Sequence, residues 1–99
     1  MNIKITARKF KARESLKDFI KEEITNLQKF NDDIIDVDVI LSYQNQFKSV
    51  KNVEIVLKVP GHTLAVNESS DEFTKAVSLA VDKLERQLKK IKTKQIEHL

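Results

Sequence analysis

The chain has 99 residues and a mass of 11.5 kDa, the size of one small domain. Its apolar share of 40% is enough for one compact core, and we expect no deep, enclosed active site in a chain this short. Cysteine is absent, which excludes disulfides, thiolate nucleophiles and thiolate metal sites. No apolar run approaches the ~20 residues of a transmembrane helix, and the N-terminus lacks a signal-peptide core. We therefore expect a soluble, cytoplasmic domain.

The formal net charge of +3 is distributed unevenly along the chain. Residues 1–29 carry eight Lys or Arg against four Asp or Glu, residues 30–82 four against nine, and residues 83–99 six against two. Two basic ends therefore flank an acidic middle. Clustered positive charge is typical of polyanion-binding proteins. A solvated, Lys-rich helix end is the alternative, and composition alone does not separate the two.

Alternating apolar and polar residues predict a short strand over 2–7. A helix is expected next, because apolar residues then recur at helical spacing on one stripe. It begins between Arg13 and Ser15 and ends near Phe30. Ser15 and Asp18 resemble a capping box at its start.

Two further stretches, 35–41 and 53–59, alternate in the same way and predict strands with one core face and one wet face. A polar connection joins them. The Pro60-Gly61 pair predicts a tight turn, and residues 62–67 supply a fourth strand.

A long helix over about 71–92 is the last predicted element, opened by a capping box of Ser69 and Glu72. The order is then β-α-β-β-β-α, and a two-layer sandwich satisfies every apolar face. We predict an α+β fold with a four-stranded mixed sheet and both helices on one face, as in double-stranded-RNA-binding domains. The first two strands run parallel through a right-handed crossover, and the others form a meander. One domain spans 1–99, with a folded core at 1–94 and a frayed tail at 95–99.

Groups of catalytic residues are nearly missing. His62 and His98 lack the spacing of metal ligands. The carboxylates at positions 32, 33, 36 and 38 fit a turn and a wet strand face, with weak cation binding as the alternative. A single glycine excludes a Gly-rich phosphate loop. We expect no enzyme, no metal site and no cofactor.

The C-terminal helix carries a cationic stripe opposite its apolar stripe. Such a stripe suits a phosphodiester backbone, because cationic side chains replace condensed counterions there. One alternative is that these cations only complement the helix macrodipole, but that effect needs only one or two cations in the last turn of the helix. A basic membrane-surface helix is a second alternative, but the apolar stripe is needed to cover the sheet. The stripe comprises Lys75, Lys83, Arg86, Lys89 and Lys90, with Lys92 at the flank and Lys94 beyond.

Aromatic residues do not form the stacking surface of a single-strand RNA reader. Tyr43 and Phe47 lie in or near the connection between the second and third strands, with no aromatic pair on neighbouring strands. We expect Phe10 and Phe47 to pack locally, with base stacking as the alternative. RNA is favoured over DNA by the shape of the predicted fold alone.

Several runs resemble the ribosome hibernation-promoting factors, also called the ribosome-associated inhibitor or sigma-54 modulation family. These are DEFTKAV at 71–77, DKLERQLKK at 82–90, the Val-Pro-Gly turn at 59–61 and the strand DVILS at 38–42. The resemblance covers nearly the whole chain. It implies a factor that binds the small ribosomal subunit where mRNA and the A- and P-site tRNAs would lie. Such a factor inhibits translation and preserves idle ribosomes under stress or in stationary phase.

Two other classes of function stay open at this point. One is a general double-stranded-RNA-binding module that acts away from ribosomes. The other is an adaptor that binds proteins through the outer sheet face.

The resemblance also assigns roles to residues. Glu23 and Asn26 stand where the family commonly has basic residues, which leaves contacts from the first helix open. The chain ends soon after the last helix, as in short members, and we expect a monomer off the ribosome. A separate ribosome modulation factor can be a further partner. The expected RNA-binding residues are Lys83, Arg86, Gln87, Lys89, Lys90 and Lys92, joined by Lys75, Arg8, Lys9 and Lys21.

Overall fold

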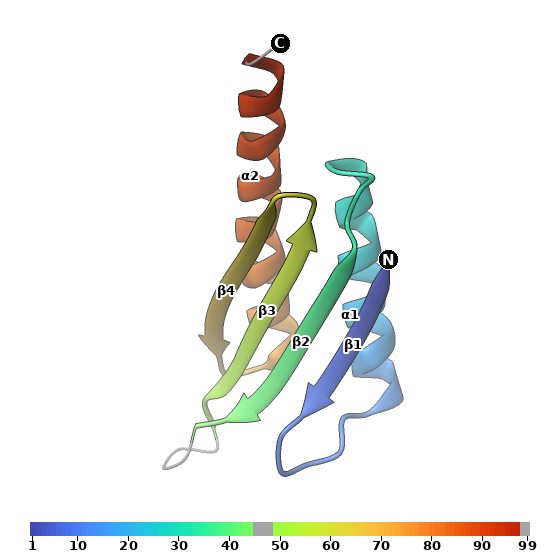
Figure 1. Cartoon of the computed structure of the whole chain (residues 1–99). Coiled ribbons are helices and arrows are strands. Elements are labelled where there is room, and N and C mark those ends of the chain that lie inside the picture. The colour runs from blue at the N-terminus through green and yellow to red at the C-terminus, as the bar shows by residue number, and fades with distance from the viewer. Residues whose placement is uncertain (45–48, 98–99) are drawn as a thin grey trace.

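The computed structural model describes residues 1–44 and 49–97, with side chains described as far as position 91. The predicted order β-α-β-β-β-α is confirmed, with one short 3-10 turn, η1, added after the first helix (Figure 1). The elements are β1 (Asn2–Ala7), α1 (Glu14–Asn26), η1 (Leu27–Lys29), β2 (Asp36–Tyr43), β3 (Lys51–Val59), β4 (His62–Ser70) and α2 (Phe73–Glu97).

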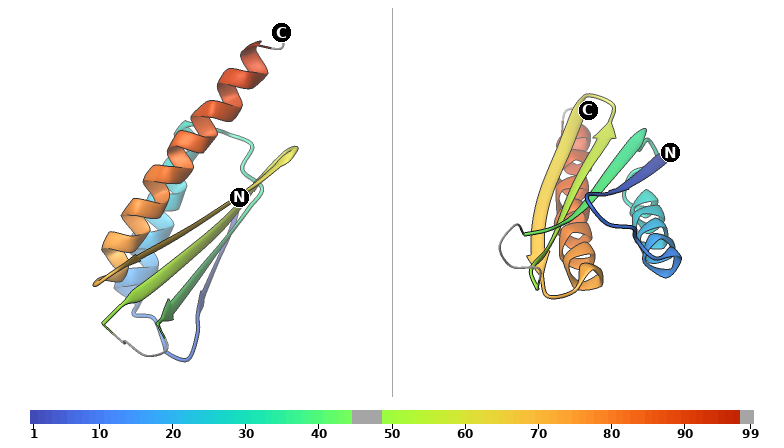
Figure 2. Two further views of the ribbon diagram at one scale, coloured as in Figure 1. Left: turned by 90° about the vertical axis from the view of Figure 1, so that its left-hand side faces the viewer. Right: turned by 90° about the horizontal axis from the view of Figure 1, so that it is seen from below.

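The four strands form one mixed sheet in the order β1-β2-β3-β4. β1 pairs with β2 in parallel, with Asn2 opposite Asp36, and the pairs β2–β3 and β3–β4 are antiparallel. Both helices cover the same face of the sheet, and the other face is open (Figure 2). The predicted sandwich is therefore confirmed, while the likeness to double-stranded-RNA-binding domains stays a prediction.

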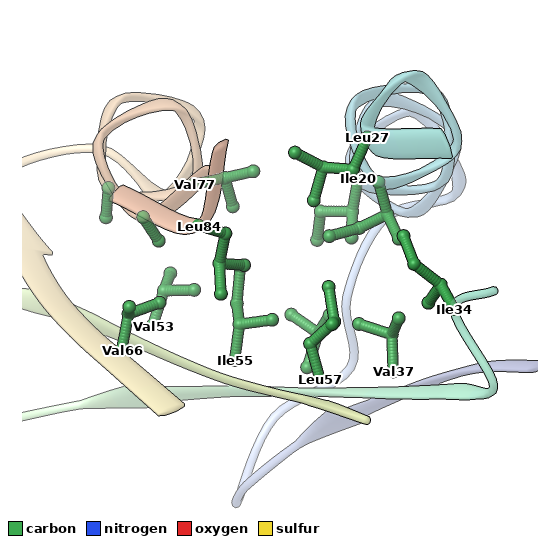
Figure 3. Close-up of a cluster of buried hydrophobic side chains, with 14 of the residues drawn as sticks. Ile20, Leu27, Ile34, Val37, Val53, Ile55, Leu57, Val66, Val77 and Leu84 are labelled. Atoms are coloured by element: carbon green, nitrogen blue, oxygen red, sulfur yellow. The ribbon is translucent and has the colours of Figure 1, made fainter. Parts of the chain in front are cut away.

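The core lies between the sheet and the two helices (Figure 3). It forms because the strands alternate and the helices repeat their apolar residues every third or fourth position. Burying each large aliphatic side chain stabilises the fold by about 1.5–3 kcal/mol. This packing fixes which face of α2 points outward. Fully buried members are Val37, Val39 and Leu41 of β2, Val53, Ile55 and Leu57 of β3, Ile20 and Ile24 of α1, Leu27 of η1, and Val77, Leu84 and Leu88 of α2.

Both predicted capping boxes are wrong. α1 begins at Glu14 after Arg13, which makes no side-chain cap hydrogen bond, so Ser15 already lies inside the helix. Ser69 lies in β4, where its hydroxyl donates a hydrogen bond to Oδ1 of Asn52 on β3. Pairing of β4 with β3 continues as far as Ser70, so the sheet holds the residue that would otherwise cap α2.

α2 extends further than the sequence pattern indicates. Its backbone is helical through Glu97, so positions 95–97 of the expected frayed tail are helix, and 98–99 lie outside the described residues. The helix therefore projects past the β3–β4 hairpin, as Figures 1 and 2 show. That hairpin closes as predicted on Pro60 and Gly61, whose φ of +81° is the left-handed conformation that favours glycine. The molecule is elongated, with extents of 49 × 22 × 18 Å.

Candidate nucleic-acid interface

The outward face of α2 carries the cationic stripe where the sequence places it. Each of its described cations is exposed, while the opposite stripe of the helix is buried against the sheet. Leu79, which is 47% exposed, is the apolar residue of this face. The placement is confirmed, and RNA binding by these side chains stays a prediction. The described cations are Lys75, Lys83, Arg86, Lys89 and Lys90.

The first cation of the stripe is already paired with carboxylates. Nζ of Lys75 lies 3.3 Å from Oδ1 of Asp71 and 4.0 Å from Oε2 of Glu72. The hydrogen bond from Lys75, together with one from Ser70 and the charge of Lys75, lowers the pKa of Asp71 below its usual range. Lys75 therefore adds little free positive charge to the stripe.

Lys83 also has an internal partner. Its Nζ lies 2.7 Å from Oε1 of Glu68, whose side chain is only 18% exposed. Glu68 stands on the face of β4 that α2 covers, because Val66 two positions earlier is buried there. Lys83 thus neutralises a carboxylate at the junction between β4 and α2.

Lys89 lies at the other flank of α2. Its Nζ is 3.2 Å from Oε2 of Glu85 and 5.0 Å from the ring centroid of Phe30, which follows η1. A cation over an aromatic ring at this distance is attracted to the ring face. Lys89 therefore helps to join α2 to the end of the first helical segment.

Arg86 and Lys90 form the centre of the stripe. They are four residues apart and so lie on the same side of the helix. Within the described part of the chain, neither forms an ion pair. Gln87 is half-buried one turn after Lys83. Arg86 and Lys90 are thus the cations best placed to meet an external anion.

The remaining predicted contacts on the helices differ in their outcome. Lys92 lies in the α2 backbone, and its side chain is outside the described residues. Phe19 lines a groove with α2 residues such as Leu79. Lys21 is exposed two residues later, about 200° around α1, so it lies away from this groove and from the stripe. Glu23, half-buried one turn after Phe19, lies on the α2 side.

Arg8 and Lys9 form a separate cationic region where β1 ends. Both are exposed, and the backbone N–H of Arg8 donates to the carbonyl of Leu41 at 2.9 Å. Lys9 has φ of +63°, a conformation that non-glycine residues rarely adopt. This region lies near the start of α2, because Phe10 stacks on Phe73, and Lys90 is about 25 Å further along the helix axis than Phe73 at 1.5 Å per residue. The structure therefore does not bring these two cations to Arg86 and Lys90.

An aromatic cluster that the sequence pattern does not reveal lies beside this second region. The rings of Phe10 and Phe73 stack with centroids 5.3 Å apart, and Tyr43 meets them edge-to-face at 4.9 and 5.4 Å. Phe10 thus packs against other rings of the protein, but these come from far along the chain rather than from its own neighbourhood, and Phe47 lies outside the described residues. The three rings come from distant segments, so no local spacing signals the cluster.

Other kinds of site find no support in the described residues. Positions 1–44 and 49–97, so far as their side chains are described, hold no group of three or more His, Asp or Glu arranged for a metal ion. His62 is exposed at the β3–β4 turn, and His98 lies outside the described residues. Among the described helices, none is long and apolar enough to cross a membrane.

The model of the family described as Sigma 54 modulation protein / S30EA ribosomal protein matches residues 3–96. The chain belongs to this family. One relative, the ribosome hibernation promoting factor of Azotobacter vinelandii, is 33% identical over 97 residues, which are 98% of this chain and 88% of the relative. The ribosome hibernation promotion factor of Bacillus subtilis is 29% identical, over 95% of this chain and 50% of its own length.

Two solved structures share the fold of this chain. A ribosomal subunit interface protein from Coxiella burnetii superposes with a TM-score of 0.85 at 29% identity, covering 94% of this chain and 99% of that one. The N-terminal domain of Thermus thermophilus Protein Y gives a TM-score of 0.80 at 28% identity, covering 92% and 99%. The family resemblance identified from the sequence is confirmed.

Proposed function

We propose that this chain is a ribosome hibernation factor. It binds the small ribosomal subunit in the region of the mRNA channel and the A- and P-site tRNAs, inhibits translation and preserves idle ribosomes under stress or in stationary phase. The names of its relatives support the ribosome as partner. The proposed mode of binding is supported by Arg86 and Lys90 on the outer face of α2, which are exposed and form no ion pair with the residues that the structure describes.

The mechanism is occupancy of a site rather than chemistry on a substrate. The core holds α2 rigidly against the sheet, so its outward cations are positioned before binding. Arg86 can donate two parallel hydrogen bonds to one phosphate, and Lys90 offers a compact charge one turn away. Each phosphate that they neutralise releases condensed counterions, which favours binding without reading the sequence.

Co-sedimentation with purified small subunits tests this proposal. We expect the native chain to bind and to be displaced by excess tRNA and mRNA. The double variant Arg86→Gln/Lys90→Gln should lose affinity by at least about tenfold, since each charge-assisted hydrogen bond contributes about 1.5 kcal/mol or more. Neither residue supports the core, so the variant should keep its thermal unfolding temperature.

The matched control is Lys4→Gln/Lys58→Gln. It removes the same charge from the open sheet face, where both lysines are exposed. This control should bind like the native chain. Equal binding by native chain and α2 variant would refute the proposed contact. Retained affinity for duplex RNA without binding to subunits would instead favour a general double-stranded-RNA-binding module.

A further inference from the structure

A hollow of about 850 Å³ lies at the end of the sheet where β1 and β2 finish and β3 begins. Figure 1 shows this end of the strands at its lower edge. It lies far along α2 from Arg86 and Lys90, so the proposed ribosome contact does not use it. Its lining residues are Arg8, Lys9, Phe10, Ser42, Tyr43, Gln44 and Asn52.

The chemistry of this lining is selective. It combines two cations, two side-chain amides, a hydroxyl and aromatic rings, and none of the described lining residues is a carboxylate. Within the described residues, neither Arg8 nor Lys9 forms an ion pair. Oδ1 of Asn52 accepts from Ser69, which leaves the amide N–H groups of Asn52 to donate to a ligand. The hollow therefore suits a ligand that is anionic at one end and planar with hydrogen-bonding edges at the other.

Tyr43 supplies a fixed aromatic surface in this hollow. Its ring is held edge-to-face by Phe10 and Phe73, and Nζ of Lys51 lies 5.9 Å from its centroid. Nζ of Lys51 also donates to the backbone carbonyl of Asp71 at 2.8 Å, which fixes this arrangement. Tyr43 nevertheless remains 36% exposed. A ring that is held in place and partly exposed is suited to stack on a nucleobase.

The backbone at Lys9 adds a second, independent observation. Its φ of +63° is unfavourable for a side chain with a Cβ, and the neighbouring hydrogen bond from Arg8 to Leu41 holds the chain there. Residues held in such conformations gather at binding sites. Here the strained turn places Lys9 beside Arg8 at the rim of the hollow.

We propose that this hollow binds one unpaired nucleoside phosphate, with its base against Tyr43 and its phosphate at Arg8 and Lys9. The proposal rests on the proposed function, because it adds a single-strand subsite to a protein whose α2 binds RNA backbone. The nucleotide can belong to an RNA chain or be free, and both present the same chemistry.

Tyrosine emission tests the site directly, since the chain has one tyrosine and no tryptophan. Titration with hexauridylate should quench this emission saturably, because a stacked base quenches the ring. Titration with uridine monophosphate distinguishes the two sources. Quenching by the hexamer alone assigns the site to RNA, and equal quenching by the mononucleotide assigns it to free nucleotides.

Variants are compared by the anisotropy of fluorescein-labelled hexauridylate. Tyr43→Leu should weaken binding by about 5- to 150-fold, the range for loss of one base stack, whereas Tyr43→Phe keeps the ring and should bind like the native chain. Lys9→Gly relieves the strained φ and removes a cation, so it should fold at least as stably and still bind more weakly. This variant separates binding from folding.

Two results would overturn the inference. One is unchanged tyrosine emission at hexamer concentrations that saturate the anisotropy. The other is native-like binding by Tyr43→Leu. The Arg86→Gln/Lys90→Gln variant should lose small-subunit binding but keep tyrosine quenching, so failure of this subsite and failure of the proposed function give different results.

Discussion

At the scale of single residues, Lys83 shows that an exposed cation can also stabilise the fold. The sequence assigns it to RNA contact, and the structure pairs it with the largely buried Glu68. Lys83→Glu would place two carboxylates together at the β4–α2 junction. We expect the free energy of unfolding to fall by about 1–2 kcal/mol, since such a pair contributes up to ~1 kcal/mol and like charges add repulsion. Urea denaturation measures this change.

A charge exchange provides the control for this prediction. Glu68→Lys combined with Lys83→Glu restores an ion pair with reversed polarity, so it should recover most of the lost stability. If the double variant instead lost as much free energy of unfolding as the two single variants together, the 2.7 Å contact would contribute no coupling between the two side chains. Loss of RNA binding in Lys83→Glu alone would therefore not prove a phosphate contact.

At the scale of elements, we expect the start of α2 to become less stable in acid. Asp71 has its pKa lowered in the folded state, chiefly by the hydrogen bond from Lys75. As the pH falls, the Asp71 carboxylate is therefore protonated in the unfolded chain before it is protonated in the folded chain. The free energy of unfolding should decrease as the pH drops below about 3.9, the ordinary pKa of Asp. Asp71→Asn should be less stable than the native chain at neutral pH, and this difference should shrink below pH ~4. Thermal unfolding from pH 2 to 7 measures both, and a difference that stays constant with pH would contradict the assignment.

The elements also differ in how far sequence predicts them. Strands such as 53–59 are predictable because alternation is a local pattern, and the structure buries Val53, Ile55 and Leu57 accordingly. The residues that cap the helices are not predictable in this way, although α1 does begin at Glu14, within the range expected from the sequence. Ser69 has the spacing of a cap, yet its hydroxyl bonds to Asn52, a residue seventeen positions away that only the folded sheet brings near. At Ser69 a contact between strands therefore determines the structure, and the local capping pattern does not.

The site follows the same rule. The outward position of the α2 cations could be predicted from helical periodicity alone, and it is correct. Which of them have partners could be predicted only in part. Asp71 and Glu85 stand four residues before Lys75 and Lys89 on the chain, a local spacing, whereas Glu68 reaches Lys83 from another strand and Phe30 reaches Lys89 from beyond η1. The hollow at Tyr43 cannot be predicted from the sequence for the same reason. Its lining comes from three segments, and a lysine at position 9 carries no signal of a positive φ.

At the scale of the whole molecule, there are two cationic regions, one at Arg8 and Lys9 and one at Arg86 and Lys90. Arg8 and Lys9 precede Phe10, which stacks on the first residue of α2, whereas Lys90 lies about 25 Å further along that helix at 1.5 Å per residue. An acidic middle separates them in the sequence, and the open sheet face, which α2 does not cover, carries Asp36, Asp38 and Glu54 on its strands. The net charge of +3 is too small to attract RNA by itself. Binding should therefore depend on these local regions rather than on the overall field.

Salt dependence tests this view. The logarithm of affinity falls linearly with the logarithm of salt concentration, with a slope of about 0.7 to 0.9 for each phosphate neutralised. If Arg86 and Lys90 each contact one phosphate, Arg86→Gln/Lys90→Gln should reduce the slope for small-subunit binding by about 1.4 to 1.8 between 50 and 200 mM salt. Lys4→Gln/Lys58→Gln removes the same charge from the sheet face and should leave the slope unchanged. Co-sedimentation at constant Mg²⁺ gives both slopes. Equal slopes for native chain and α2 variant would mean that Arg86 and Lys90 do not meet phosphates, whatever their effect on affinity.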